Sequence, residues 1–163
     1  MATRSQILVS NKAVTDSVEF VKKYAKKSKA NLPSLYKHWD GYQSGTLPDL
    51  LPFLYYFKKD RGLSDCSYLI AQLACYLNSQ ADKQCSELEK RSFTGFGITN
   101  ELFGGIEYIY IIDCASSQLY VLEEKWVEET NETYWREEKV IDLNISLENI
   151  QIIIDEVTEK ENS

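Results

Sequence analysis

The chain has 163 residues and a mass of 18.8 kDa, with 44% apolar and 26% charged residues and a net charge of −7 at pH 7. This size and composition are typical of one globular domain with a real core. No apolar run reaches the roughly eighteen residues of a membrane span, and the negative charge argues against bulk binding to DNA, which requires neutralisation of phosphates.

The first half of the chain predicts strands alternating with helices. The periodicity of its apolar residues indicates two strands, over residues 5–10 and 34–39, and three helices, over residues 13–31, 46–61 and 64–78. Thr15 or Asp16 is expected to cap the first of these helices, which is rich in lysine, and Thr46 to cap the second. The polar residues 79–91 predict a mobile loop.

The second half changes to the period of strands. Four runs rich in β-branched and aromatic residues predict strands over residues 93–99, 106–113, 119–124 and 134–143. Their short connections favour an antiparallel meander. Ser146 is expected to cap a final amphipathic helix, with residues 159–163 as a frayed tail. The sequence therefore predicts a single α+β domain, residues 1–163, whose mostly antiparallel sheet of about five to six strands is covered by about four helices.

Charge is unevenly divided along the chain. Residues 1–60 contain ten Lys or Arg and five Asp or Glu, whereas residues 61–163 contain eight and twenty. The lysines of the first helix are interpreted as its solvated side, although a local basic face attracts anions. The apolar run at residues 6–9 is too short for a signal peptide, which predicts a cytoplasmic protein.

Cysteine usage indicates reduced thiols. The four cysteines form no C-x-x-C pair and are scattered along the chain, at Cys66, Cys75, Cys85 and Cys114. Because the chain has a single histidine and no paired cysteines, the spacing predicts no zinc site, and we expect no metal and no cofactor. No P-loop, Rossmann fingerprint, HExxH or nucleophile elbow occurs, which argues against the common chemistries of those motifs.

The segment from His38 to Gly45 (HWDGYQSG) is the densest in chemistry and holds the only histidine. If residues 34–40 form a strand, Tyr36, His38 and Asp40 share one face. A carboxylate beside a histidine raises the pKa of the imidazole and sets its tautomer, which suits acid–base work. The structural alternative is that Asp40 accepts backbone N–H groups in a turn, while His38 bonds a neighbour and Trp39 fills the core.

The candidate ligand-binding residues share polar or aromatic character and lie near this segment or on strands expected to neighbour it: Arg4, Tyr36, His38, Asp40, Tyr42 and Glu107. An arginine beside aromatic rings suits a phosphate or a nucleobase. Glu107 lies on an apolar strand, where a buried carboxylate needs a partner such as Arg4 or His38. His38 and Asp40 are the candidate catalytic residues if the chain catalyses a reaction.

Several blocks of this sequence, above all residues 1–5 (MATRS) and 38–45, resemble a group of uncharacterised bacterial and phage proteins. Those proteins start with M-x-T-R-S/A and contain H-W/Y-D-G-Y-P-S/E-G, and residues 47–53, 95–98 and 106–113 are similar as well. Two features depart from the group: Gln43 replaces its proline, and the lysine-rich helix is inserted where its members have a short turn. The resemblance implies a fold, a site at the motif and a link to phage–host conflict, but no reaction.

Three functions are compatible with these observations. The leading hypothesis is a non-enzymatic binding module for a macromolecular partner or a nucleotide-like ligand, because the motif lacks a recognisable catalytic set. The alternative is an enzyme acting on a nucleotide or phosphate ester, with His38 as acid–base and Asp40 orienting it. The third is a structural or assembly protein, in which the eleven tyrosines contribute to a homodimer interface.

Overall fold

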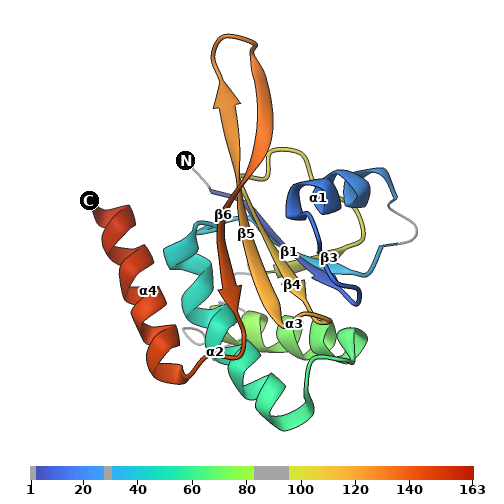
Figure 1. Cartoon of the computed structure of the whole chain (residues 1–163), viewed down its shortest axis with the longest axis vertical. Coiled ribbons are helices and arrows are strands. Elements are labelled where there is room, and N and C mark those ends of the chain that lie inside the picture. Colours follow the sequence, from blue (N-terminus) through green and yellow to red (C-terminus); the bar gives the residue numbers. More distant parts are fainter. Residues whose placement is uncertain (1–2, 28–30, 83–95) are drawn as a thin grey trace.

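One six-stranded sheet organises the domain (Figure 1). The computed structural model describes residues 3–27, 31–82 and 96–163. Within them the strand order is β3-β2-β1-β4-β5-β6. The bounds are β1 (Ser5–Ser10), β2 (Ser34–Lys37), β3 (Phe96–Thr99), β4 (Tyr108–Asp113), β5 (Gln118–Val127) and β6 (Glu132–Asp142). Only β1 and β4 are parallel neighbours, so the predicted mostly antiparallel α+β single-domain fold is confirmed.

The predicted meander is correct for three of its four strands. β4, β5 and β6 pair in succession, but β3 lies at the opposite edge of the sheet, beside β2. The segment between β3 and β4 must therefore pass across β2 and β1. Hydrogen bonds from the side chain of Gln6 fix this segment in place. The side chain donates to the carbonyl oxygen of Glu101 at 2.7 Å and accepts from the amide of Phe103 at 3.2 Å. The few residues between β3 and β4 favoured pairing of these two strands, but β1 occupies the place beside β4.

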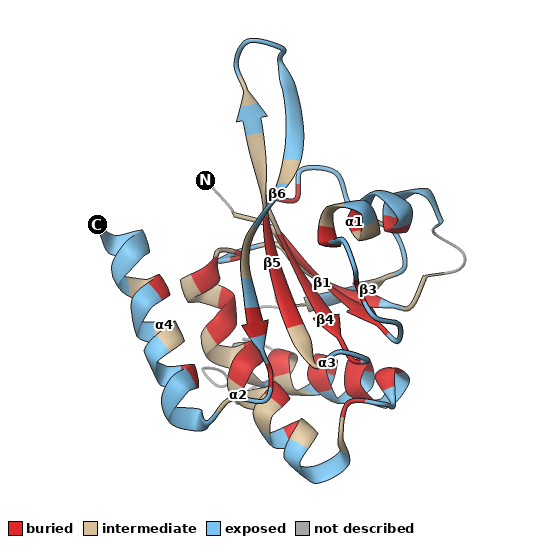
Figure 2. Cartoon of the chain, in the orientation of Figure 1, coloured by how far each residue is buried: buried red, intermediate tan, exposed pale blue. Residues whose placement is uncertain are grey.

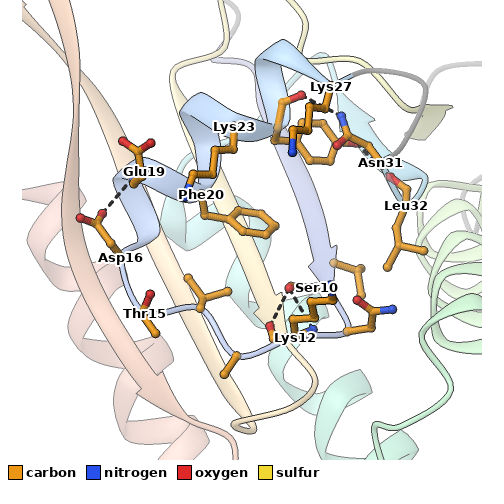
Figure 3. A pocket seen from close by; sticks show the side chains of 15 residues that line it. Ser10, Lys12, Thr15, Asp16, Glu19, Phe20, Lys23, Lys27, Asn31 and Leu32 are labelled. Atoms are coloured by element: carbon orange, nitrogen blue, oxygen red, sulfur yellow. Dashed lines mark hydrogen bonds between the residues drawn. The ribbon is translucent and has the colours of Figure 1, made fainter.

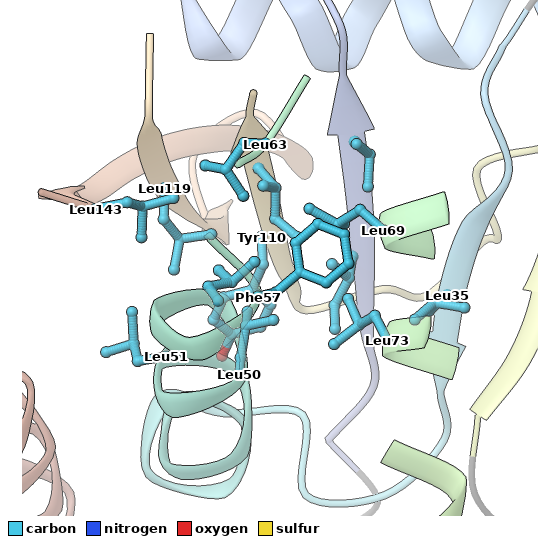
Figure 4. Packing of buried hydrophobic residues seen from close by; sticks show 14 of the residues in the cluster. Leu35, Leu50, Leu51, Phe57, Leu63, Leu69, Leu73, Tyr110, Leu119 and Leu143 are labelled. Atoms are coloured by element: carbon cyan, nitrogen blue, oxygen red, sulfur yellow. The ribbon is translucent and has the colours of Figure 1, made fainter. Parts of the chain in front are cut away.

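Helices cover both faces of the sheet, and their bounds are α1 (Ser17–Lys26), α2 (Gln43–Arg61), α3 (Cys66–Asp82) and α4 (Leu147–Asn162). Val21 and Tyr24 of α1 pack with Leu8 and Ile109 on one face. The other face packs against α2 and α3, with α4 beside α2. Figure 4 shows Tyr110 of β4 among leucines of this second core, and Figure 2 shows burial concentrated along the central strands and the inner sides of these helices.

Helix boundaries differ from those predicted where tertiary contacts outweigh local signals. α1 is capped by Asp16, as expected, but ends at Lys26. α2 starts at Gln43 and not after Thr46, and it continues through Pro48 and Pro52. Its buried leucines keep the helix intact although each proline removes an amide donor.

Two segments predicted to lack structure are partly helical. α3 continues to residue 82, so the predicted loop 79–91 begins in a helix, and residues 83–91 lie outside the described part of the chain. α4 continues to residue 162, so the predicted frayed tail 159–163 is almost entirely helical. No helix in the described residues is long and apolar enough to cross a membrane.

Candidate functional site

The HWDGYQSG segment forms a tight corner between β2 and α2, and Gly41 is its closest point to the sheet. A Cβ at this position would lie 2.6 Å from the carbonyl carbon of Arg4 and 2.6 Å from the amide nitrogen of Ser5. The amide of Gly41 donates to the carbonyl oxygen of Thr3 at 2.9 Å, and the buried Tyr110 hydroxyl donates to the carbonyl oxygen of Gly41 at 2.9 Å. Only glycine allows this approach of two backbones.

Asp40 and Gly45 close the other side of the corner. Asp40 has φ of 53°, a left-handed conformation that aspartate tolerates better than most residues. Its carbonyl oxygen lies against Gly45, where a Cβ would clash with it, and accepts a hydrogen bond from the Thr46 hydroxyl at 3.4 Å. The spacing of aspartate and two glycines in the motif is therefore explained by backbone packing.

A row of aromatic rings begins with Tyr36, on the sheet face covered by α1, and continues into the motif. The Tyr36 hydroxyl and Nδ1 of His38 are hydrogen-bonded at 2.8 Å. The ring centres of Tyr36 and Phe103 are 4.6 Å apart, and those of His38 and Trp39 are 4.9 Å apart. Trp39 is 53% exposed, so it does not fill the core.

Arg4 and Glu107 meet through their backbones. The carbonyl oxygen of Arg4 accepts from the amide of Glu107 at 3.0 Å and from that of Tyr108 at 3.2 Å. No ion pair joins the Arg4 and Glu107 side chains in the described residues, and the Glu107 side chain is exposed. The Nε atom of Arg4 is buried and has no hydrogen-bond partner among the described residues.

On the opposite sheet face, the same segment borders a groove of about 520 Å³. Its walls come from the β2–α2 corner, α2, α3 and β3, and its chemically notable members are Lys37, Trp39, Asp40, Tyr42, Asp49 and Phe96. Lys37 Nζ donates to the carbonyl oxygen of Gly45 at 2.6 Å and lies 5.6 Å from the centre of the Phe96 ring. Burial lowers the pKa of Lys37, and the Asp40 and Asp49 carboxylates only partly oppose this shift.

The carboxylate of Glu161 caps the helix that follows the motif. It accepts from the amides of Gln43 at 3.0 Å and Ser44 at 3.1 Å, which are among the unpaired donors at the start of α2. Glu161 also lines a second cavity, of about 400 Å³, together with Tyr42 and Glu107. Two further carboxylates on β5, Glu123 and Glu124, make this cavity strongly acidic.

The six predicted ligand-binding residues separate into small groups. Tyr36 and His38 are hydrogen-bonded on one sheet face, while the Tyr42 hydroxyl donates to the Asp40 carboxylate at 3.2 Å. In the described part of the chain, His38 and Asp40 share no hydrogen bond or ion pair, because β2 ends at Lys37 and Asp40 no longer follows the strand alternation. The charge of Asp40 raises the pKa of Tyr42.

Reasoning from the sequence missed four residues that help to form the candidate site. Lys37 and Asp49 line the groove, and the alternation of β2 could have placed Lys37 on the face opposite to Tyr36. The ring of Phe103 lies tilted against that of Tyr36 because of the unexpected crossing between β3 and β4. Nothing in the local sequence signalled that Glu161, more than a hundred residues away, would cap α2.

Neither a metal site nor a known relative identifies the chemistry. Among residues 3–27, 31–82 and 96–163, no three His, Cys, Asp or Glu side chains are placed to hold a metal ion, and Cys66, Cys75 and Cys114 are free thiols. Comparison of the chain with family models, curated proteins and solved structures finds no match. The function must therefore be inferred from the residues themselves.

Proposed function

We propose that the chain is a non-catalytic binding module whose groove beside the β2–α2 corner takes a cationic side chain of a protein partner. The observation that supports this most is the combination of two carboxylates, Asp40 and Asp49, with two aromatic walls, Trp39 and Tyr42, in one groove of about 520 Å³. Carboxylates and aromatic faces both attract ammonium and guanidinium groups.

The charges already in the groove favour a cation over an anion. Lys37, the lysine among the described lining residues, is directed at the carbonyl oxygen of Gly45, and no described ion pair uses Asp40 or Asp49. The position of Lys37 near Phe96 indicates that this wall accommodates an ammonium group. The acidic cavity beside Glu161 extends the negative potential, which would steer a basic segment toward the groove.

Catalysis by a His38–Asp40 pair is less well supported. The described hydrogen bond of His38 is made with Tyr36, and that of the Asp40 side chain with Tyr42. An orienting carboxylate must instead contact the imidazole that it serves. An assay of nucleotide and phosphate-ester hydrolysis tests the alternative, because activity lost in His38→Gln would favour an enzyme. A role in phage–host conflict rests on the family resemblance alone.

The test is a titration of isotope-labelled protein with the amides of N-acetyl-arginine and N-acetyl-lysine, followed by NMR. We expect saturable shifts of the Trp39 indole and Gly45 amide signals, and none with the neutral amide of N-acetyl-glutamine. The Asp40→Asn/Asp49→Asn variant should lose these shifts.

The matched control is Glu128→Gln/Glu129→Gln, which changes the net charge equally at the exposed β5–β6 turn. This control should bind the probes like wild type. When wild type and both variants are used as baits, the relevant protein partner is the one that binds wild type and the control but not Asp40→Asn/Asp49→Asn. Equal responses to the neutral probe, or equal losses in the two variants, would contradict the proposal.

A further inference from the structure

A separate cavity lies on the α1 side of the sheet, away from the groove beside the motif (Figure 3). It has a volume of about 540 Å³, is open to solvent, and is lined by the end of β1, residues 11–16, one side of α1, and Lys27, Asn31 and Leu32. This volume falls within the range of about 300–1,000 Å³ that is usual for small-molecule sites. The cavity also adjoins the carboxyl end of β1, which runs parallel to β4, and open sheets with parallel strands commonly bind ligands at such ends.

The loop between β1 and α1 is held in place by buried groups of the core. The Asp113 carboxylate is fully buried and accepts from the amide of Val14 at 2.8 Å. The hydroxyl of Tyr120 donates to the carbonyl oxygen of Val14 at 2.9 Å. Nearer the sheet, the Ser10 hydroxyl donates to the carbonyl oxygen of Lys12 at 2.7 Å. These bonds make the cavity floor preorganised, which lowers the entropic cost of binding.

The far end of the cavity is fixed in a similar way. The Tyr24 hydroxyl donates to the carbonyl oxygen of Leu32 at 3.1 Å, and the side-chain Nδ2 of Asn31 donates to the carbonyl oxygen of Tyr24 at 2.7 Å. α1 is thereby joined to the segment that leads into β2.

Among the described lining residues, two are aromatic, Phe20 and Tyr24, and three are cationic. Phe20 lies between α1 and the loop, as Figure 3 shows, and it is only half-buried, so part of its surface is open to a ligand. Lys12, Lys23 and Lys27 line the same cavity, and no described ion pair neutralises them.

The two carboxylates of the cavity lie together at one end. Figure 3 shows Asp16 beside Glu19 there, where Asp16 accepts from the amide of Glu19 at 2.9 Å as the cap of α1. The two carboxylates are therefore gathered at one end of the cavity, and the three lysines line other parts of it.

We propose that this cavity is a second binding site, and that its ligand is a small phosphorylated molecule carrying a planar ring, of the mononucleotide class. Phe20 provides a surface on which a ring stacks, and Lys12, Lys23 and Lys27 provide ammonium donors for phosphate oxygens. The lysine-rich helix that the sequence presents as a solvated surface then has a ligand-binding side, formed by residues 20, 23, 24 and 27, which recur at helical spacing.

The test is isothermal titration of the intact chain with three probes at low salt: ADP, adenosine and pyrophosphate. ADP carries both the ring and the phosphates, so we expect it to bind at least about tenfold more tightly than either of the others. Lys23→Gln/Lys27→Gln should weaken ADP binding by about tenfold or more, because it removes two phosphate donors. Phe20→Leu should weaken ADP but leave pyrophosphate unchanged.

The chain offers a matched control on the same helix. Lys22→Gln/Lys26→Gln removes the same charge at the same spacing from exposed residues that do not line the cavity, and its ADP affinity should stay within about twofold of wild type. Equal losses in the two lysine pairs, or no binding of ADP to wild type, would overturn the proposal. Pyrophosphate binding as tight as that of ADP would overturn the role of the ring. Asp40→Asn/Asp49→Asn should keep ADP affinity, which separates this site from the groove.

Discussion

Substitution of Gly41 by alanine should destabilise the whole domain, because the glycine lies against the backbone of β1. The added methyl would be 2.6 Å from two backbone atoms and 2.8 Å from the Cβ of Ser5, so no flexible side chain can move aside. Overpacking of this kind costs about 1–3 kcal/mol. Displacement of the corner also weakens its bonds to Thr3 and Tyr110, at about 1 kcal/mol each. We therefore expect a loss of about 3–5 kcal/mol.

Urea unfolding followed by circular dichroism measures this loss, provided that the slope with urea concentration is the same in both proteins. The control is Gly104→Ala, because nothing lies within 4 Å of the position that its Cβ would occupy. This variant should remain within about 0.5 kcal/mol of wild type. A Gly41→Ala protein as stable as the Gly104→Ala protein would refute the assignment of the motif glycine to close backbone packing.

Three other outcomes are expected. Asp113→Asn should cost about 2–4 kcal/mol in urea unfolding, because the buried carboxylate accepts three backbone amides and an amide group cannot satisfy them all; a loss below about 1 kcal/mol would contradict this. Glu161→Gln should lower stability by about 1 kcal/mol through the weakened cap of α2, whereas Glu159→Gln should have little effect. Burial raises the pKa of Tyr108 and Tyr110 above the usual 10.0. The unfolded chain therefore loses these protons first, and stability should be complete below about pH 10 and fall as pH rises further. Tyr110→Phe should flatten that fall, and an unchanged slope would show that the tyrosine is not responsible.

Local sequence patterns predicted most of the elements, because each amphipathic period reflects a face that packs against the core. The strand at residues 5–10 was predicted in its observed place, and the cap of α1 is Asp16, one of the two candidates, Thr15 and Asp16. What the patterns lacked was pairing information. The alternation of a strand does not identify its neighbour. The position of β3 beside β2, and the contacts of Gln6 with the segment that follows β3, are therefore seen only in the folded chain.

For the candidate site, too, the sequence indicated which segment was involved but not how its side chains are arranged. The unusual composition of residues 38–45 marked the corner, but whether His38 and Asp40 share a face depended on where β2 ends. The left-handed conformation of Asp40 ended that alternation. Glu161 was beyond local prediction, because its partners at the start of α2 are close only in the folded chain.

The parallel pairing of β1 with β4 has a consequence for synthesis on the ribosome. Ser5 pairs with Tyr108, about a hundred positions later, so the strand made first obtains its central neighbour only when two-thirds of the chain has been translated. Until residues 96–99 emerge, β1 and β2 can form at most a two-stranded antiparallel pair, which is marginally stable in water, and β3 then adds only a short third strand at the edge. The antiparallel β4–β5–β6 unit, whose contacts are local, is expected to form soon after it emerges. Nascent chains arrested before residue 96 should therefore remain sensitive to protease in β1 and β2, and chains arrested well beyond residue 113 should acquire protection in β1 and β4 together.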